Sequence, residues 1–352
     1  MRPVPTEVGV GVTTATPATR LSVLDRSRTR QGQDASQALR DTVAFAQLAE
    51  RLGYHRFWVS EHHGVPGVAG SAPTVLAAAV AARTSRIRVG TGGVMLPNHR
   101  PMVVAEQFGV LSSLFPGRID MGLGRSVGFT DGVRRALGRG KDAADAFAGQ
   151  LAELLGYFDG SQGVHPDVHA RPAEGLRVPA FVLATGAGAD IAADAGLPLV
   201  IGALRGEDEM LAAVDRYRTR FRPSAQGAEP YVVLSGNVAV AGTAAEARKL
   251  LVSEAWSSAY ARTHGEFPPL TPEPEVLARE MSPRERAAYE QALHGHVAGT
   301  PQEAAVALGT LMARAGADEF LVTTHAYDRA ALLDSYRLLA EAMGLAPSPI
   351  AR

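Results

Sequence analysis

The chain has 352 residues, of which 46% are hydrophobic, and its 35 basic and 36 acidic side chains give a formal net charge of −1. This length suits one large α/β barrel or two ordinary domains. The balanced charge gives no electrostatic reason to expect nucleic acid or an anionic membrane as a partner. The absence of cysteine excludes disulfides, thiolate metal sites and a cysteine nucleophile. No apolar run reaches the roughly 18 residues that a membrane span needs.

The N-terminal segment differs in character from the remainder of the chain. Residues 1–19 are rich in Pro, Thr and Val, and they lack the basic segment followed by a long apolar run that marks a signal peptide. We therefore expect a flexible tail over residues 1–19, a single domain over residues 20–347 and a cytoplasmic protein.

Short apolar strands alternate with amphipathic helices in the first half of the chain. The expected strands cover residues 21–24, 57–60, 87–91 and 119–122. The helices between them cover residues 34–52, 73–82 and 101–114. Asp34 is the expected N-cap of the first helix, Gln37 occupies its capping-box position, and Gly53 ends it.

The second half continues the alternation. Its expected strands cover residues 181–184, 198–201 and 320–324, and residues 231–240 contain one more. A last helix covers residues 329–343. Eight strands with intervening helices predict an α/β fold of the (β/α)8 TIM barrel type, with insertions. Residues 156–178 are expected to form a long loop. Residues 256–299 are a candidate lid insertion, or alternatively an extra helix packed outside the barrel.

Residues 56–63 (Arg-Phe-Trp-Val-Ser-Glu-His-His) have the pattern of a buried strand followed by three ionisable side chains. The C-terminal end of a barrel strand is the usual place for catalytic groups, which makes Glu61 and His62 candidates. Adjacent side chains at a strand end point in opposite directions, so His62 and His63 form a poor metal site and we expect no metal. One histidine should face the pocket while the other packs against a loop. A structural histidine is the alternative.

Three glycine-containing segments also follow strands. Gly92 and Gly93 form either a turn with positive φ or a stretch of backbone that approaches a flat ring system closely. Arg125 follows a strand and two glycines, which suits a phosphate because a guanidinium donates two bonds to an anion. A salt bridge to a neighbouring loop is the alternative.

The third segment contains Thr185, Gly186, Ala187 and Gly188, and it opens a helix whose N–H groups could hold a phosphate. It does not complete a dinucleotide fingerprint, so we expect no separate NAD domain. His325 and Tyr327 follow the eighth strand and are expected at the same end of the barrel.

Several motifs, taken in order, resemble one family. Glu61-His62-His63, residues 89–97 (Val-Gly-Thr-Gly-Gly-Val-Met-Leu-Pro) and residues 115–125 (Phe-Pro-Gly-Arg-Ile-Asp-Met-Gly-Leu-Gly-Arg) are similar to those of the bacterial luciferase-like flavin monooxygenases. The similarity spans residues 21–125 and resumes at 181–202 and 320–339. The order and spacing of the motifs make it specific, whereas any one motif alone would not.

The resemblance implies a flavoprotein oxidoreductase, a homodimer, and reduced FMN supplied transiently by a separate flavin reductase. By the same resemblance, His62 matches the active-site histidine beside the flavin, with Glu61 orienting the turn. Gly92 and Gly93 match a bulge, often a non-prolyl cis peptide, on which the isoalloxazine rests.

The phosphate of the flavin would, by the resemblance, contact Arg125 and the turn from Thr185 to Gly188. Relatives usually have serine in that turn, whereas this chain has Thr185 followed only by Gly and Ala. Each lost neutral hydrogen bond costs about 0.5–1.5 kcal/mol. We therefore expect weak or transient flavin binding.

The resemblance thus predicts a monooxygenase that uses reduced FMN and dioxygen to oxidise a small organic or biosynthetic substrate. One alternative is a deazaflavin-dependent oxidoreductase that transfers hydride. Another is a barrel that binds flavin or a partner without turnover, because fold does not fix function. The sequence does not identify the substrate.

Overall fold

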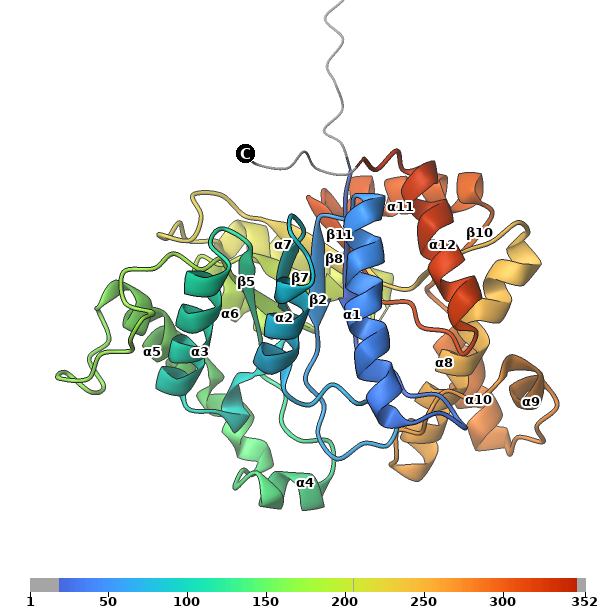
Figure 1. Cartoon of the computed structure of the whole chain (residues 1–352), viewed down its shortest axis with the longest axis horizontal. Coiled ribbons are helices and arrows are strands. Elements are labelled where there is room, and N and C mark those ends of the chain that lie inside the picture. The colour runs from blue at the N-terminus through green and yellow to red at the C-terminus, as the bar shows by residue number, and fades with distance from the viewer. Residues whose placement is uncertain (1–18, 205, 347–352) are drawn as a thin grey trace, which may run out of the picture.

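Eight parallel strands close into a barrel, which confirms the predicted (β/α)8 fold (Figure 1). The computed structural model describes residues 19–346 except residue 205, so residues 1–18 of the tail expected over residues 1–19 lie outside the described residues. In barrel order the strands are β1 (Arg20–Asp25), β2 (Arg56–Val59), β3 (Arg88–Thr91), β5 (Ile119–Gly124), β6 (Ala180–Ala184), β7 (Leu199–Gly202), β8 (Val232–Gly236) and β11 (Glu319–Val322). The parallel pairing of β11 with β1 closes the ring. The short strand β4 (Val94–Met95) extends the pairing along the end of β5.

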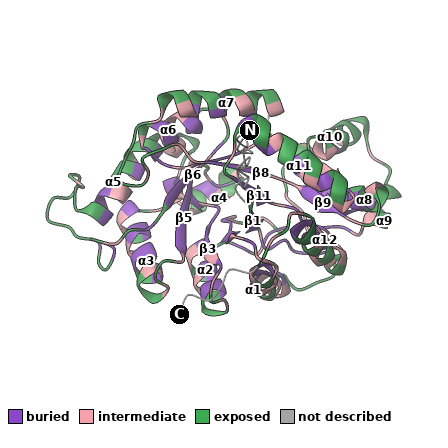
Figure 2. Ribbon diagram, turned by 90° about the horizontal axis from the view of Figure 1, so that it is seen from above, coloured by how far each residue is buried: buried purple, intermediate pink, exposed green. Residues whose placement is uncertain are grey.

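Helices surround the strands, with their buried faces turned to the barrel and their exposed faces outward (Figure 2). The helices that follow barrel strands in the usual alternation are α1 (Ala35–Leu52), α2 (Pro73–Ala82), α3 (Pro101–Leu114), α5 (Phe147–Asp159), α6 (Gly188–Asp194), α7 (Glu207–Arg220) and α12 (Arg329–Ala342). The further elements are η1 (Leu96–Asn98), α4 (Asp131–Ala136), η2 (Lys141–Ala146), β9 (Val238–Val240), α8 (Ala244–His264), α9 (Glu273–Leu277), α10 (Pro283–Leu293), β10 (Val297–Gly299) and α11 (Pro301–Ala315). No helix in the described part of the chain is both long enough and apolar enough to cross a membrane.

The predicted ends of α1 are right, but the predicted capping box is wrong. The Asp34 carboxylate accepts a hydrogen bond from the Ser36 N–H at 2.9 Å, and Gly53 ends the helix with a φ of 87°. The Gln37 Oε1, which would accept from the Asp34 N–H in a capping box, accepts instead from Arg40 Nε at 3.0 Å. Gln37 Nε2 donates to Asp41 Oδ1 at 2.8 Å, so both ends of the amide have partners along the helix.

Two other expectations need correction. Residues 231–240 form two strands rather than one, because the chain breaks at Asn237 and β9 leaves the barrel to pair with β10. The Val238 N–H donates to Thr324 Oγ1 at 2.7 Å, which replaces a ladder bond at the break. The loop expected over 156–178 begins only at Gly160, because α5 continues to Asp159.

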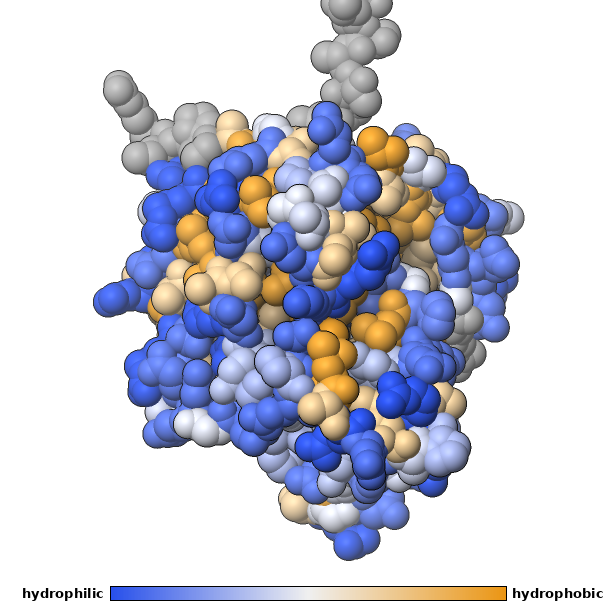
Figure 3. All heavy atoms as spheres, turned by 90° about the vertical axis from the view of Figure 1, so that its right-hand side faces the viewer, coloured by the Kyte–Doolittle hydropathy of each residue, from blue (hydrophilic) through white to orange (hydrophobic). Residues whose placement is uncertain are grey.

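The insertion expected over residues 256–299 consists of the end of α8, α9, α10 and β10. Trp256, Val276 and Tyr289 form its own small core. The outer face on this side of the molecule is mainly hydrophilic, with apolar side chains only in small groups (Figure 3). The loop between α8 and α9 reaches the barrel, where the Leu270 N–H donates to the Thr29 carbonyl at 2.9 Å. The insertion thus borders the end of the barrel where the strands finish, and its role as a lid stays a prediction.

A buried ionic network crosses the barrel interior. Arg56 Nη1 donates to Asp120 Oδ2 at 2.7 Å, and Arg56 Nε donates to both oxygens of Glu319 at 3.0 Å. Trp58 Nε1 donates to Asp120 Oδ2 at 3.2 Å, and Tyr231 Oη donates to Glu319 Oε2 at 2.8 Å. Burial alone would lower the pKa of Arg56, but Asp120 and Glu319 outweigh it and raise the pKa above its usual value. The two carboxylates therefore keep Arg56 positively charged inside the barrel.

We expect Arg56→Met to destabilise the fold strongly. The substitution keeps the apolar stem but leaves Glu319 buried without its cation, which typically costs about 3–5 kcal/mol, while Asp120 keeps its pair with Arg88. Urea unfolding measures the loss. The control is Arg337→Met on α12, whose pairs with Asp334 and Glu341 are exposed and should contribute less than about 1 kcal/mol. Equal losses for the two variants would contradict the role given to Arg56.

Candidate active site

The predicted site residues all follow the C-terminal ends of parallel barrel strands. Such ends meet at one rim of a (β/α)8 barrel. In Figure 1 this rim is the lower end of the barrel, with α4 on one side and α9 and α10 on the other. The described chain enters the barrel at the opposite end, through the start of β1.

Glu61 is the centre of a hydrogen-bond network that sequence reasoning did not foresee. Its Oε1 lies 2.6 Å from His63 Nε2 and 2.8 Å from His99 Nε2, and its Oε2 accepts from the Met95 N–H at 2.8 Å. Burial alone would raise the pKa of Glu61, but the bonds from His63 and His99 outweigh it and lower the pKa to about 2. The carboxylate thus joins the end of β2 to the segment that follows β3 and β4.

These three side chains could also be considered as metal ligands, because their donor atoms lie within 4.8 Å of one another. Each donor atom already takes part in a hydrogen bond within the network, however. The arrangement is that of a carboxylate shared by two imidazoles. The histidine at position 99 follows Pro97-Asn98 in a polar stretch, which was the only sequence signal for it.

His62 points away from this network, as the alternation of side chains predicts. Its N–H donates to the Gly70 carbonyl at 2.9 Å, and its Nδ1 lies 3.1 Å from Ser60 Oγ. Burial, reinforced by the positive charges of Arg26 and Arg28, lowers the pKa of His62 to about 4. The imidazole is therefore neutral at neutral pH, and it can accept or donate a proton.

The peptide bond between Gly92 and Gly93 is cis, as the resemblance implies, and neither residue has a positive φ. A Cβ on Gly92 would lie 2.6 Å from Leu24 Cδ1, and one on Gly93 would lie 2.8 Å from the Gly122 carbonyl oxygen. The close packing of the barrel at this point therefore requires both glycines, whatever binds above them. The alternative of a positive-φ turn is wrong.

Arg125 and Thr185 follow neighbouring strands, since Gly124 of β5 pairs with Leu183 of β6. The side chain of Arg125 is 40% exposed, and its Nη2 lies 3.8 Å from an oxygen of the highly exposed Asp145. The salt bridge considered as the alternative is thus present, but an exposed pair of this length is weak and leaves the guanidinium available to an anion.

The turn after β6 has little side-chain chemistry of its own. Gly186 has a φ of 89°, and α6 begins at Gly188 without a side-chain cap. On the neighbouring strand, a Cβ on Gly124 would have no contact closer than 3.9 Å, so there is open space beside Arg125. The site thus offers open space, an exposed guanidinium and the backbone of a nearby turn. These are groups that can bind a phosphate.

A second ionic cluster lies on the loop after β1. Arg26 Nη2 donates to Glu254 Oε1 at 2.6 Å, and Arg28 Nε lies 3.1 Å from Glu254 Oε2. Burial alone would raise the pKa of Glu254, but Arg26 and Arg28 outweigh it and lower the pKa to about 2. Sequence reasoning missed this cluster, although the alternation of arginines at positions 26, 28 and 30 was a usable signal.

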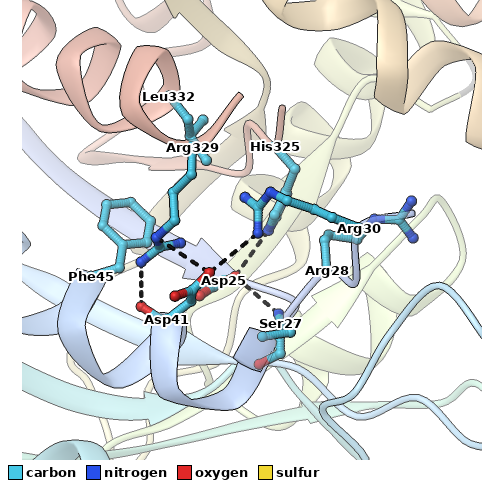
Figure 4. Close-up of a pocket in the computed structure, with 10 residues that line it drawn as sticks. Asp25, Ser27, Arg28, Arg30, Asp41, Phe45, His325, Arg329 and Leu332 are labelled. Atoms are coloured by element: carbon cyan, nitrogen blue, oxygen red, sulfur yellow. Dashed lines mark hydrogen bonds and ion pairs between the residues drawn. The ribbon is translucent and has the colours of Figure 1, made fainter. Parts of the chain in front are cut away.

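His325 lies close to that loop, as expected, but it is a structural group. Its Nε2 is 3.0 Å from Asp25 Oδ1 and its Nδ1 is 2.7 Å from the Thr323 carbonyl oxygen. Figure 4 shows both residues at a small cavity between β1, α1 and α12. Tyr327 donates from its hydroxyl to the Gln31 carbonyl at 3.3 Å on the outer side of the loop.

The sequence of this chain is similar to one family model and to several known proteins. Residues 19–319 match the family model described as luciferase-like monooxygenase. A luciferase-like monooxygenase of Escherichia coli (strain K12) is 36% identical over 319 residues, which is 90% of this chain and 95% of that protein. N-acetyl-S-alkylcysteine monooxygenase of Bacillus subtilis (strain 168) is 39% identical over 243 residues, which is 66% of this chain and 71% of that protein.

Comparison with solved structures gives the same result. The crystal structure of apo-MsnO8 is 33% identical and has a TM-score of 0.83, covering 94% of this chain and 99% of that one. Two more distant structures share the fold alone. One is the oxygenating constituent of 3,6-diketocamphane monooxygenase from Pseudomonas putida in complex with FMN, at 18% identity, a TM-score of 0.68 and coverage of 95% and 100%. The other is an F420-dependent secondary alcohol dehydrogenase, at 15% identity, a TM-score of 0.67 and coverage of 92% and 99%.

The family model spans most of the chain, and relatives above 30% identity align with nearly its whole length. This protein belongs to the luciferase-like monooxygenase family.

Proposed function

We propose that this protein is an FMN-dependent monooxygenase that receives reduced FMN from a separate flavin reductase and uses dioxygen to oxidise a small organic substrate. The observation that carries the proposal is a neutral, partly buried His62 on the same rim as Gly92 and Gly93, where side chains have no room, and the weakly paired Arg125. The Bacillus relative is named for N-acetyl-S-alkylcysteine, which supports a small organic molecule as the substrate class.

The residues have separate roles in this proposal. The Gly92–Gly93 backbone would support the flavin ring, and Arg125 with the turn from Thr185 to Gly188 would hold the phosphate. Bound flavin supplies the electrons for oxygen chemistry, while the protein supplies position and electrostatics. His62 would take or give a proton at Nε2, since its Nδ1 is next to Ser60 Oγ. Glu61 would keep the rim in place through His63, His99 and Met95.

A deazaflavin-dependent hydride transferase is the second candidate, because an F420-dependent dehydrogenase shares the fold. We expect the protein to change the rate at which dioxygen reoxidises reduced FMN, and to have no such effect on reduced F420. Stopped-flow absorbance of each reduced cofactor, with the protein in excess and in parallel anaerobic runs, measures this. Binding of F420 with no effect on reduced FMN would favour the second candidate.

We expect His62→Ala to slow the protein-dependent phase of FMN reoxidation by about 100-fold or more, because general acid–base catalysis contributes about 10²–10⁴-fold. The affinity for FMN should change by no more than a few-fold. The control is His169→Ala, which removes an exposed histidine that is paired with Glu174. In the sequence, His169 is far from His62. A rate equal to that of the unchanged protein would remove His62 from the mechanism.

The homodimer expected from the resemblance is also a proposal. Val75 on α2 and Val103, Val110 and Leu114 on α3 have exposed fractions of 46–70%. The two helices are neighbours, because Thr74 Oγ1 donates to Gln107 Oε1 at 3.0 Å. Apolar side chains that gather on one face are typical of an interaction surface.

We expect Val110→Asp combined with Leu114→Asp to produce monomers, because two carboxylates would lose hydration in a dimer interface. Analytical ultracentrifugation over a range of protein concentrations measures the state. The control is Val306→Asp on α11, which is 68% exposed on a different helix. A double variant that associates like the unchanged protein would place the interface elsewhere.

A further inference from the structure

Two guanidinium groups at the rim share a single carboxylate. Glu254 receives Arg26 at one oxygen and Arg28 at the other, so one unit of positive charge on this pair is not matched within the cluster. Burial lowers the pKa of Arg28 only to about 10, so it keeps its charge at neutral pH. This surplus of one positive charge is therefore present at the rim at neutral pH.

The same two groups have unused donors. Over residues 19–346 without residue 205, Nη1 of Arg28 and Nε of Arg26 are buried and have no hydrogen-bond partner. Arg28 itself is only 2% exposed, with Phe267 stacked on its guanidinium at 4.3 Å and its Nη2 bonded to Ser257 Oγ at 2.7 Å. Buried donors normally find an acceptor. Arg28 Nε and Glu254 Oε2 lie 3.1 Å apart but also form no hydrogen bond, so the cluster has donors that a further acceptor could use.

The nearby arginine on the same loop does not share this property. Arg30 donates to Asp41 Oδ2 at 3.4 Å and to the carbonyls of Ala326 and Tyr327 at 3.2 and 2.8 Å. In Figure 4 its side chain runs into the cluster around Asp25 and Asp41, whereas that of Arg28 points away from it. The carboxylates of that cluster are therefore occupied by other groups.

The pair lies on a loop that is close to His62 and is held firmly. The His62 N–H donates to the Gly70 carbonyl at 2.9 Å, and a Cβ on Gly70 would lie 3.4 Å from the Arg26 carbonyl oxygen. Backbone bonds fix the loop on both sides, from the Ala69 N–H to the Ser27 carbonyl and from the Leu270 N–H to the Thr29 carbonyl. The two guanidinium groups are thus pre-positioned, which reduces the entropic cost of binding a ligand.

We propose that Arg26 and Arg28 bind the carboxylate of an organic monoanion and hold its remaining part next to His62. A guanidinium fork matches a carboxylate in shape, and one negative charge balances the surplus of one. Above its second pKa, inorganic phosphate carries two negative charges, which exceeds the surplus of one. That this monoanion is the molecule oxidised rests on the proposed function, whereas its binding does not.

The test compares carboxylates with their neutral counterparts, in the absence of flavin and reductant. The probes are hexanoate, phenylacetate and N-acetyl-L-methionine, each beside its primary amide, and inorganic phosphate. Isothermal titration and thermal unfolding measure binding. We expect at least one carboxylate to bind ten-fold or more tightly than its amide and than phosphate. Amides or phosphate that bind as well as every carboxylate, or no binding by any carboxylate, would overturn the proposal.

Variants locate the site. Arg28→Met and Arg26→Met should each remove the preference for carboxylate over amide. Arg26 is the more tolerant position, since its side chain is 21% exposed, and it keeps the test usable if Arg28→Met does not fold. The control is Arg171→Met, whose side chain is 76% exposed on a distant loop. A preference that survives Arg26→Met would overturn the assignment.

The outcome separates the two proposals. Carboxylate binding that depends on Arg26, in a protein without effect on FMN reoxidation, would defeat the oxygenase proposal and leave the anion site standing. The reverse result, FMN reoxidation by a protein that ignores carboxylates, would defeat the anion site alone.

Discussion

The interior of the barrel is organised around one guanidinium. Arg56 of β2 bonds Asp120 of β5 and Glu319 of β11, which lie two strands away on either side in the barrel order. Alternate strands of such a barrel contribute side chains to the same interior layer, so the three groups meet at one level. A buried carboxylate is stable only when paired, and each of these depends on a cation from another strand. The ion pairs thus tie β2, β5 and β11 to one another across the barrel interior.

The rim itself carries two ionic clusters of opposite character. Glu61 is a carboxylate shared by His63 and His99, whereas Glu254 is shared by Arg26 and Arg28. His62 is adjacent to Glu61 in sequence but does not bond its carboxylate, because successive side chains alternate in direction. His63 bonds Glu61, whereas burial and the charges of Arg26 and Arg28 lower the pKa of His62. In the proposed function, a histidine near a cationic pair suits an anionic substrate.

Local sequence was a good guide where local forces decide. Proline at the first turn correctly predicted that α2 begins at Pro73 and α3 at Pro101, because proline lacks the N–H that a helix start leaves unpaired. Prediction from local sequence failed where a side chain had another hydrogen-bond partner or a strand another strand to pair with. Gln37 bonds Arg40 and Asp41 instead of forming a capping box, and residues 231–240, which were expected to contain one strand, contain β8 and β9. The resemblance implied roles for Gly92, Gly93 and Arg125, whereas the contacts that each of them makes were found only in the structure.

The sequence by itself determined the alternation of strands and helices, the barrel and the family, because periodic burial and short motifs are properties of neighbouring residues. Only the tertiary structure decided which charged groups meet. Arg28 and Glu254 are separated by more than two hundred positions, and so are Arg56 and Glu319. Burial makes such pairs obligatory, since an unpaired ion inside a protein is costly, but no local pattern says which partner the fold will supply.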